Sequence, residues 1–247
     1  MTGLDYEGLA LLNSLENVFY WFSPFLISMI KAVIFDLDGT LIDTNKIHLA
    51  EFKRVFKDSF SISLKDSEIL PLFGESVGEI VSRLLSRHGK AFSKKQVGNL
   101  VRQKVSLYAS EIRKKHLMHA STLKFLKKLR KKGLKLAIAS GTERKMLNAS
   151  LKPKELRLFD ALVCANDVKR AKPFPDELSL AVKKLGLRKS ECLFVGDGLL
   201  DAKAAENAGV RFAALLSGIV SRKEFQKLKP VAVLKEIKGL EKVLAKL

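Results

Sequence analysis

The segment "KAVIFDLDGTLIDTN" (residues 31–45) holds a short apolar run that ends at two carboxylates. Residues 32–35 are apolar without alternation, which predicts a strand buried on both faces of a parallel sheet. Asp36 and Asp38 follow, and residues two apart in a strand point to the same side. We therefore expect both carboxylates to converge at the carboxyl end of this strand, where open α/β sheets bind ligands.

Two explanations are open for such a pair, because like charges at short distance repel each other. A divalent cation such as Mg²⁺ would compensate them by taking oxygen ligands. Alternatively, one carboxyl stays protonated and is available as a general acid. Gly39 permits a tight turn directly afterwards, whose backbone N–H groups could receive a phosphate.

The rest of the chain divides into a helical stretch and an alternating one. Apolar residues recur at helical spacing from about residue 46 to residue 113, with no strand pattern among them. After about residue 120, strand and helix patterns alternate, which predicts a parallel sheet covered on both faces. The predicted fold class is α/β: a Rossmann-like three-layer core (29–44 and 120–247) with a small all-helical cap (45–119) inserted after the first strand.

Composition indicates a folded protein with a basic surface. Hydrophobic residues make up 47% of the 247 residues, and the net charge is +19. A basic surface attracts phosphates in general, including metabolites, nucleic acid and anionic lipid. The charges are spread along the chain without any nucleic-acid signature, which favours solvated helix faces. Cys164 and Cys192 lie in apolar runs, so we expect core thiols and a reducing, cytoplasmic location.

The first 28 residues contain no Lys or Arg, unlike the rest of the chain. The apolar run 18–30 is shorter than the ~20 residues of a spanning helix and contains Pro24. A secretory signal would require a basic stretch before this apolar run, and the sequence has none there. We expect residues 1–28 to be a peripheral extension, or upstream sequence absent from a native protein that begins at Met29. Interfacial contact with a membrane is the alternative.

Four motifs resemble those of the haloacid dehalogenase superfamily of phosphohydrolases. "DLDGTL" (36–41) is similar to the first motif, and "LAIASGT" (136–142) ends a strand in Ser140 like the second. "KPFPD" (172–176) offers Lys172 like the third. "LFVGDGLLDAKAAENAG" (193–209) supplies the acidic fourth motif through Asp197 and Asp201. The resemblance covers residues 29 to about 240, and each motif falls at a strand end or in the loop that follows.

The resemblance implies roles for these residues. Asp36 would be the nucleophile that forms an aspartyl-phosphate, and Asp38 would protonate the leaving oxygen and then activate water. Mg²⁺ would be held by the Asp36 carboxylate, the Asp38 backbone carbonyl and Asp197. Ser140, Gly141 and Lys172 would bind the phosphoryl group. Asp201 would be a supporting residue that orients Lys172 or metal-bound waters. Ser140 has a second interpretation as the N-cap of the next helix.

Two positions bear on which branch of the superfamily this is. Gly198 stands where many capped relatives carry serine, although other branches share the "GDG" sequence. Asp38 favours phosphoryl transfer, because the dehalogenase branch lacks an acid at this position. The helical insert is similar to the cap of phosphoglycolate phosphatases and β-phosphoglucomutases, and Asp43 and Thr44 would occupy its hinge.

Several smaller expectations concern single side chains. Asp43 could equally cap the following helix, and Ser121 is predicted to cap the helix that begins there. Candidates to face the site from the cap are Gly74, Glu75, Ser76 and His48. The four histidines (His48, His88, His116 and His119) are otherwise predicted to be surface or helix-end residues.

These observations favour a Mg²⁺-dependent phosphomonoesterase for a small phosphorylated metabolite, with phosphoglycolate as one candidate. A sugar phosphomutase of the same superfamily is the alternative. A basic nucleic-acid-binding protein without catalysis is a third hypothesis, motivated by the charge and by the lysine-rich segment 113–135. That segment also has Leu123, Leu126 and Leu129 at helical spacing, as a packed surface helix should. The oligomeric state is left open.

Overall fold

The computed structural model describes residues 29–112 and 115–247. The predictions for the N-terminal extension, including its contact with a membrane, lie outside these residues. Within the described part, no helix has both the length and the apolar character needed to cross a membrane. Residues 30–246 form one compact unit, and it is this unit that we describe.

A sheet of six parallel strands forms the centre of the unit. Its strands are β1 (Ala32–Phe35), β2 (Lys135–Ser140), β3 (Ala161–Cys164), β4 (Cys192–Gly196), β5 (Arg211–Leu215) and β6 (Ala232–Leu234). Their order is β3-β2-β1-β4-β5-β6, so β1 lies between β2 and β4. The direction of chain winding reverses at β1, which is where open α/β sheets form a crevice for ligands.

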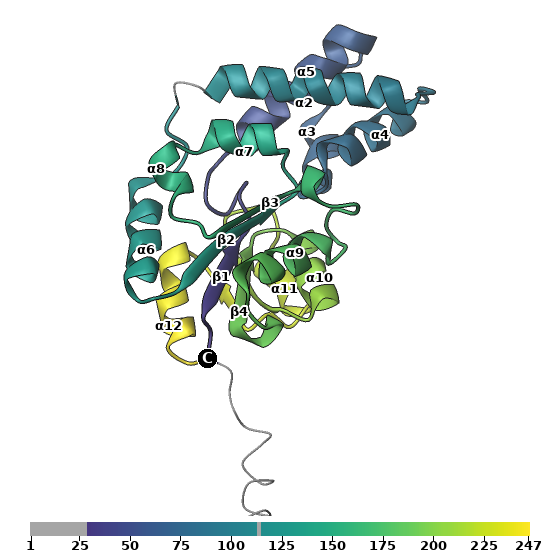
Figure 1. The fold of residues 1–247 in the computed structure, drawn as a ribbon. Helices are drawn as coiled ribbons and strands as arrows, with labels where there is room; N and C mark the ends of the chain where they lie inside the picture. Colours follow the sequence, from purple (N-terminus) through teal and green to yellow (C-terminus); the bar gives the residue numbers. More distant parts are fainter. Residues whose placement is uncertain (1–28, 113–114) are drawn as a thin grey trace, which may run out of the picture. The chain divides into compact units, whose positions relative to one another are not determined.

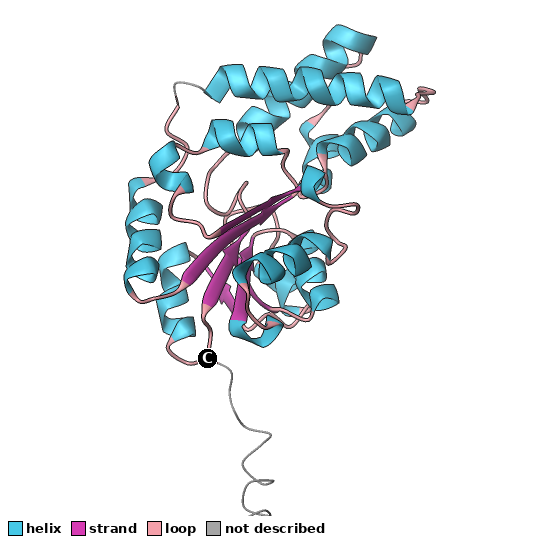
Figure 2. Cartoon of the chain, viewed as in Figure 1, coloured by secondary structure: helices cyan, strands magenta, loops and turns pink. Residues whose placement is uncertain are grey.

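Helices cover both faces of the sheet, which gives the three predicted layers (Figures 1 and 2). On one side lie α9 (Asp176–Leu185), α10 (Leu199–Ala208) and α11 (Arg222–Gln226); on the other lie α6 (Ala120–Lys131) and α12 (Leu240–Leu244). Alternate β1 residues, Ala32 and Ile34, join the α9 and α10 side chains in one apolar cluster. Both cysteines are buried, Cys164 and Cys192 each at the end of a strand, so the prediction of core thiols is confirmed.

The segment between β1 and α6 is helical, and its apolar side chains form a cluster that also includes Met146 from beyond β2. It contains α2 (Asn45–Phe60), α3 (Asp66–Ile69), the 3-10 helix η1 (Leu70–Leu72), α4 (Val77–Arg87) and α5 (Lys94–Ile112). Phe52, Phe56, Leu84 and Tyr108 lie in this cluster. Ile42 pairs with Asp38 on one side and with Met118 on the other, where the chain leaves the sheet and returns to it.

Shorter elements complete the connections between β2 and the C-terminus. They are α7 (Arg144–Ser150), α8 (Pro153–Leu156), η2 (Ala165–Asp167), η3 (Lys189–Glu191) and η4 (Ile237–Gly239). In the lysine-rich helix α6, Leu126 and Leu129 are fully buried and Leu123 is half-buried. The apolar spacing therefore marks a packed surface helix, as the sequence predicts.

Three predicted helix caps are wrong. One is Ser140, because helix α7 has Glu143 as its N-cap residue. Helix α6 begins at Ala120 and its N-cap is His119, whose Nδ1 accepts the backbone N–H of Ser121. Ser121 already lies within the first turn, so its hydroxyl cannot act as the cap. Helix α2 has Thr44 as its N-cap residue, and Asp43 is exposed. The helix-end prediction holds for His88, the C-cap of α4, and for His119, while His116 is exposed as predicted.

Candidate active site

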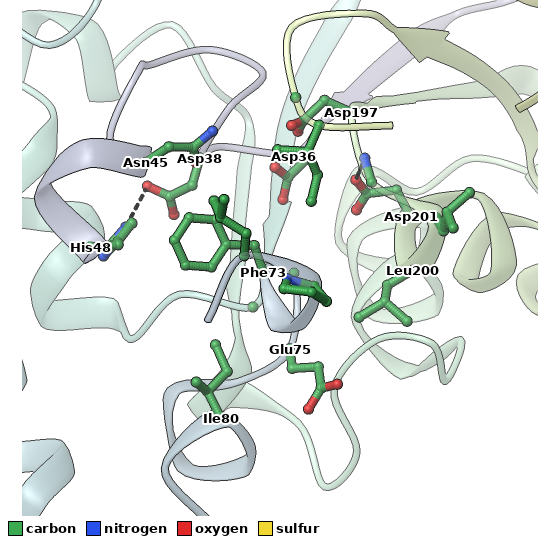
Figure 3. A pocket seen from close by; sticks show the side chains of 18 of the residues that line it. Asp36, Asp38, Asn45, His48, Phe73, Glu75, Ile80, Asp197, Leu200 and Asp201 are labelled. Carbon is green, nitrogen blue, oxygen red and sulfur yellow. Dashed lines mark hydrogen bonds and ion pairs between the residues drawn. The ribbon is translucent and has the colours of Figure 1, made fainter. Parts of the chain in front are cut away.

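The predicted site residues meet where three adjacent strands end. Asp36 follows β1, Ser140 is the last residue of β2, and Asp197 follows β4. Their strands are neighbours in parallel register, so the three ends face one crevice. Figure 3 shows the carboxylates of Asp36, Asp197 and Asp201 gathered on one side of this crevice, with Asp38 opposite them.

The Lys172 ammonium group lies between two of these carboxylates. Its Nζ donates to Asp36 Oδ1 at 2.6 Å and to Asp201 Oδ1 at 2.7 Å. Burial alone would lower the pKa of Lys172, but the two carboxylates outweigh it and raise that pKa. The second Asp201 oxygen accepts the backbone N–H of Gly198 at 2.9 Å. Both Asp201 oxygens are thus engaged, which suits a residue that orients Lys172.

Three carboxylates compose a cluster that could hold a cation. One oxygen each from Asp36, Asp197 and Asp201 lies within 4.8 Å of the others. Burial is the main reason that the pKa of Asp36 is raised well above its usual value and that of Asp197 is raised to about 7. A divalent cation would relieve this excess of buried negative charge, and oxygen donors are the ligands that Mg²⁺ prefers. The residues present therefore fit Mg²⁺.

The turn after β1 brings the backbone against Asp197. Thr40 Oγ1 donates to Asp197 Oδ1 at 2.9 Å. Gly39 has a φ of +84°, and a Cβ there would lie 2.3 Å from Asp197 Oδ2. Only glycine satisfies both conditions, since other residues rarely adopt this φ and would also collide with the carboxylate.

Asp38 is held by three donors rather than by the cluster. Thr44 Oγ1 donates to its Oδ1 at 2.5 Å and Thr142 Oγ1 donates to its Oδ2 at 2.6 Å. His48 Nε2 lies 3.2 Å from Oδ1. Burial raises the pKa of Asp38, but the interactions with His48 and with the two threonine hydroxyls lower it to about 2. Asp38 is therefore ionised in this arrangement.

A chain of buried polar groups continues from Asp38 into the helical segment. His48 Nδ1 lies 2.9 Å from Lys104 Nζ, which donates to Glu51 Oε2 at 3.1 Å. An ammonium group only donates, so Nδ1 accepts and the proton of a neutral His48 ring lies on Nε2, facing Asp38. The ring of Tyr108 stacks on that of His48, with centroids 4.9 Å apart. His48 lines the cavity, as its prediction as a site-facing residue requires, and the alternative of a surface or helix-end residue is wrong.

The strand-end residues were predicted from the sequence, but most of the polar residues around Asp38 and His48 were not. Thr44 was predicted only as a hinge residue, and Thr142, Glu51 and Lys104 were not predicted at all. Lys104 did leave a signal, because it stands between Leu100 and Tyr108 on the apolar face of α5. A lysine at such a position must find a buried partner.

The remaining predicted site residues lie in the loops around the crevice. Ser140 is buried, lines the cavity and accepts the Thr142 N–H on its Oγ at 3.2 Å. A Cβ on Gly141 would lie 2.9 Å from the Gly74 carbonyl oxygen, so this loop runs close to the helical segment. Gly74 and Glu75 line the cavity, whereas Ser76 caps helix α4 instead. The expectation that Ser76 faces the site is wrong, because its hydroxyl accepts the N–H of Glu79.

A family model described as haloacid dehalogenase-like hydrolase matches residues 33–215. This chain belongs to the haloacid dehalogenase-like hydrolases. Among curated relatives, pyrophosphatase PpaX of Bacillus mycoides (strain KBAB4) is 28% identical over 219 residues, which span 88% of this chain and 98% of the relative. The hydrolase is therefore an enzyme of the family that the sequence motifs indicate.

Solved structures agree with this assignment. A hydrolase from Pseudomonas syringae matches with a TM-score of 0.76 at 26% identity, covering 88% of this chain and 99% of that one. A β-phosphoglucomutase from Clostridium difficile shares the fold with a TM-score of 0.76 at 20% identity, covering 88% of this chain and 98% of that one. The structural neighbours of this hydrolase thus include phosphomutases as well as hydrolases.

Proposed function

We propose that this hydrolase is a Mg²⁺-dependent phosphomonoesterase that acts on a small phosphorylated metabolite through an aspartyl-phosphate on Asp36. The single observation that carries the proposal is the separation of two carboxylates into two environments. Asp36 lies in the acidic cluster against Lys172, and Asp38 lies apart, held by Thr44, Thr142 and His48. One carboxylate is thereby suited to attack phosphorus and the other to move protons.

In the first step, an Asp36 oxygen attacks phosphorus, the bond from phosphorus to the leaving oxygen breaks, and Asp38 gives that oxygen a proton. In the second step, Asp38 takes a proton from water, the water oxygen attacks phosphorus, and the bond to Asp36 breaks with release of phosphate. Mg²⁺, held by Asp36, the Asp38 carbonyl and Asp197, would neutralise charge on the phosphoryl group. Lys172, Ser140 and Gly141 bind its remaining oxygens.

The protonation of Asp38 links chemistry to the cap. Asp38 is ionised in this structure, which is the state that the second step needs. The first step needs Asp38 protonated, so its hydrogen bond from His48 must weaken. His48 belongs to α2 in the helical segment. A shift of that segment when substrate binds would therefore change the proton affinity of Asp38.

The test is release of inorganic phosphate from p-nitrophenyl phosphate and a panel of phosphorylated metabolites, with Mg²⁺ and with EDTA. Asp36→Asn should lower kcat by at least about a thousandfold. Asp58→Asn removes an exposed carboxylate from α2 and should leave kcat unchanged. Release of phosphate that persists in Asp36→Asn or in EDTA would contradict the proposal.

A phosphomutase is the second candidate, because the same two carboxylates can pass the phosphoryl group to a second hydroxyl instead of to water. The observation that favours this candidate is that the helical segment lines the cavity together with the strand ends. A cavity covered in this way can keep water away from the aspartyl-phosphate. Incubation with a hexose 1-phosphate separates the two. A mutase yields the isomeric hexose phosphate, and a phosphatase yields free hexose and phosphate.

A further inference from the structure

The cavity in front of Asp36 has a volume of about 380 Å³, which is in the size range of small-molecule sites. Strand-end residues supply its polar side. Most of the remainder is apolar, and we call this part the apolar wall. It consists of Phe52, Leu70, Pro71, Phe73, Val77 and Ile80 from the helical segment, of Leu199 and Leu200 from α10, and of Ile219 and Val220 after β5. Figure 3 shows Phe73, Ile80 and Leu200 around the space in front of the carboxylates.

The charges that face this space are mostly negative. The described lining holds six carboxylates and two ammonium groups, those of Lys104 and Lys203. Lys104 is 1% exposed and already donates to Glu51 while facing His48. Lys203 is exposed on α10. Glu75 is the acidic lining residue that the helical segment contributes next to the apolar wall. Its side chain is 11% exposed and pairs with Arg83 at 2.8 Å.

A leaving group with its own negative charge would be poorly accommodated here. It would lose water against the apolar wall, where the buried cation Lys104 is already paired with Glu51, and it would face the Glu75 carboxylate. Burial already raises the pKa of Glu75, with Arg83 opposing. An uncharged leaving group avoids both costs, and its apolar face can pack on Phe73. Asn45, which lines the same cavity, can hydrogen-bond to a hydroxyl.

We propose that the substrate is a phosphate monoester whose leaving group is uncharged, such as a polyol or sugar, and carries no second anionic group. This inference rests on the proposed function. It sets this hydrolase apart from an enzyme that acts on pyrophosphate, phosphoglycolate or a bisphosphate, because each of these presents a second anion to the apolar wall.

The test compares kcat/KM for neutral monoesters (glycerol 3-phosphate, hexose phosphates) with that for pyrophosphate, phosphoglycolate and fructose 1,6-bisphosphate. The neutral esters should be favoured by at least about tenfold. Ile219 is 57% exposed and lines the cavity, so it tolerates a cation. Ile219→Lys should shift the ratio toward the anionic substrates, and Ile219→Met should leave it unchanged. Preference of the wild type for an anionic substrate, or anionic turnover that Lys203→Ala abolishes, would overturn the proposal.

Equilibrium binding to Asp36→Asn separates this inference from the proposed function. Titration calorimetry of that variant with Mg²⁺ and each ester measures selectivity without turnover. Tighter binding of neutral esters, even if no ester is hydrolysed by the wild type, supports the substrate class while the hydrolytic mechanism fails. Tighter binding of anionic esters, or binding of none, overturns the substrate class whatever the hydrolysis assay gives.

Discussion

The ammonium group of Lys104 lies 2.9 Å from Nδ1 of His48, on the side of the ring away from Asp38. This contact fixes which ring nitrogen carries the proton, so Nε2 is the one that donates to the Asp38 carboxylate. Burial lowers the pKa of Lys104, opposed by Glu51. A buried lysine on one helix thus sets the donor that a histidine on another helix offers to the proton-transfer residue.

Replacing this histidine should move the pH dependence of the reaction. His48→Ala removes the strongest of the interactions that lower the pKa of Asp38, so that pKa should rise from about 2. The acid limb of the kcat–pH profile should then shift to higher pH, and at pH values below the shifted limb kcat should fall by about tenfold per pH unit. His88→Ala, at the end of α4, is the matched control and should change neither. An unshifted acid limb in His48→Ala would show that His48 does not tune Asp38.

Gly39→Ala should weaken Mg²⁺ activation. Its Cβ would lie 2.3 Å from Asp197 Oδ2, so the carboxylate must move. Gly133→Ala is a close control, because Gly133 has a similar φ of +81° but nothing within 4 Å of its Cβ position. Both variants should lose about 1 kcal/mol of stability through backbone strain. Only Gly39→Ala should need more Mg²⁺ for half-maximal activity; equal Mg²⁺ requirements would contradict the prediction.

Mg²⁺ binding should compete with protons. The pKa of Asp197 is raised to about 7 by burial and by the charge of Asp201, and that of Asp36 is raised as well. Below this pH the free enzyme carries a proton that the cation must displace, so the Kd for Mg²⁺ should rise by about tenfold per pH unit. Calorimetry in two buffers with different ionisation enthalpies measures the proton released. An affinity that stays constant as pH falls below about 7 would refute this.

Glu177 should make the fold less stable as pH rises. It is fully buried, and neither of its carboxylate oxygens has a hydrogen-bond partner within the described residues. Burial raises its pKa from the usual 4.5 to about 7, against the charge of Lys172. The folded state therefore holds this proton more tightly than the unfolded state, and the free energy of unfolding falls as pH rises from 4.5 to about 7.

Glu177→Gln should remove this pH dependence. Its stability relative to the wild type should increase over that pH range by about 3 kcal/mol, measured by urea unfolding. Glu206→Gln, an exposed change on α10, should show the same pH dependence as the wild type. Parallel curves for Glu177→Gln and the wild type would mean that Glu177 keeps its ordinary pKa.

The sequence alone was sufficient for the alternation of strands and helices and for the strand ends that carry the cluster. The apolar run before Asp36 does not alternate with polar residues, which predicts a central strand. Side chains two residues apart in a strand point to the same side, so Asp36 and Asp38 are expected to project from the same strand end. The motifs at Ser140, Lys172 and Asp197 likewise fall at or after strands. Such patterns can be predicted from the sequence because they depend only on residues that are close together along the chain.

Tertiary structure decided what those carboxylates can do. The sequence predicted that Asp36 and Asp38 converge, yet Lys172 engages Asp36 while His48, Thr44 and Thr142 engage Asp38. Thr142 is 104 residues from Asp38 along the chain. Lys104 meets His48 across 56 residues, because α2 and α5 pack together. Burial and the packing of distant helices determine the proton affinities and form the apolar wall. The spacing of residues along the chain predicts neither the proton affinities nor the apolar wall.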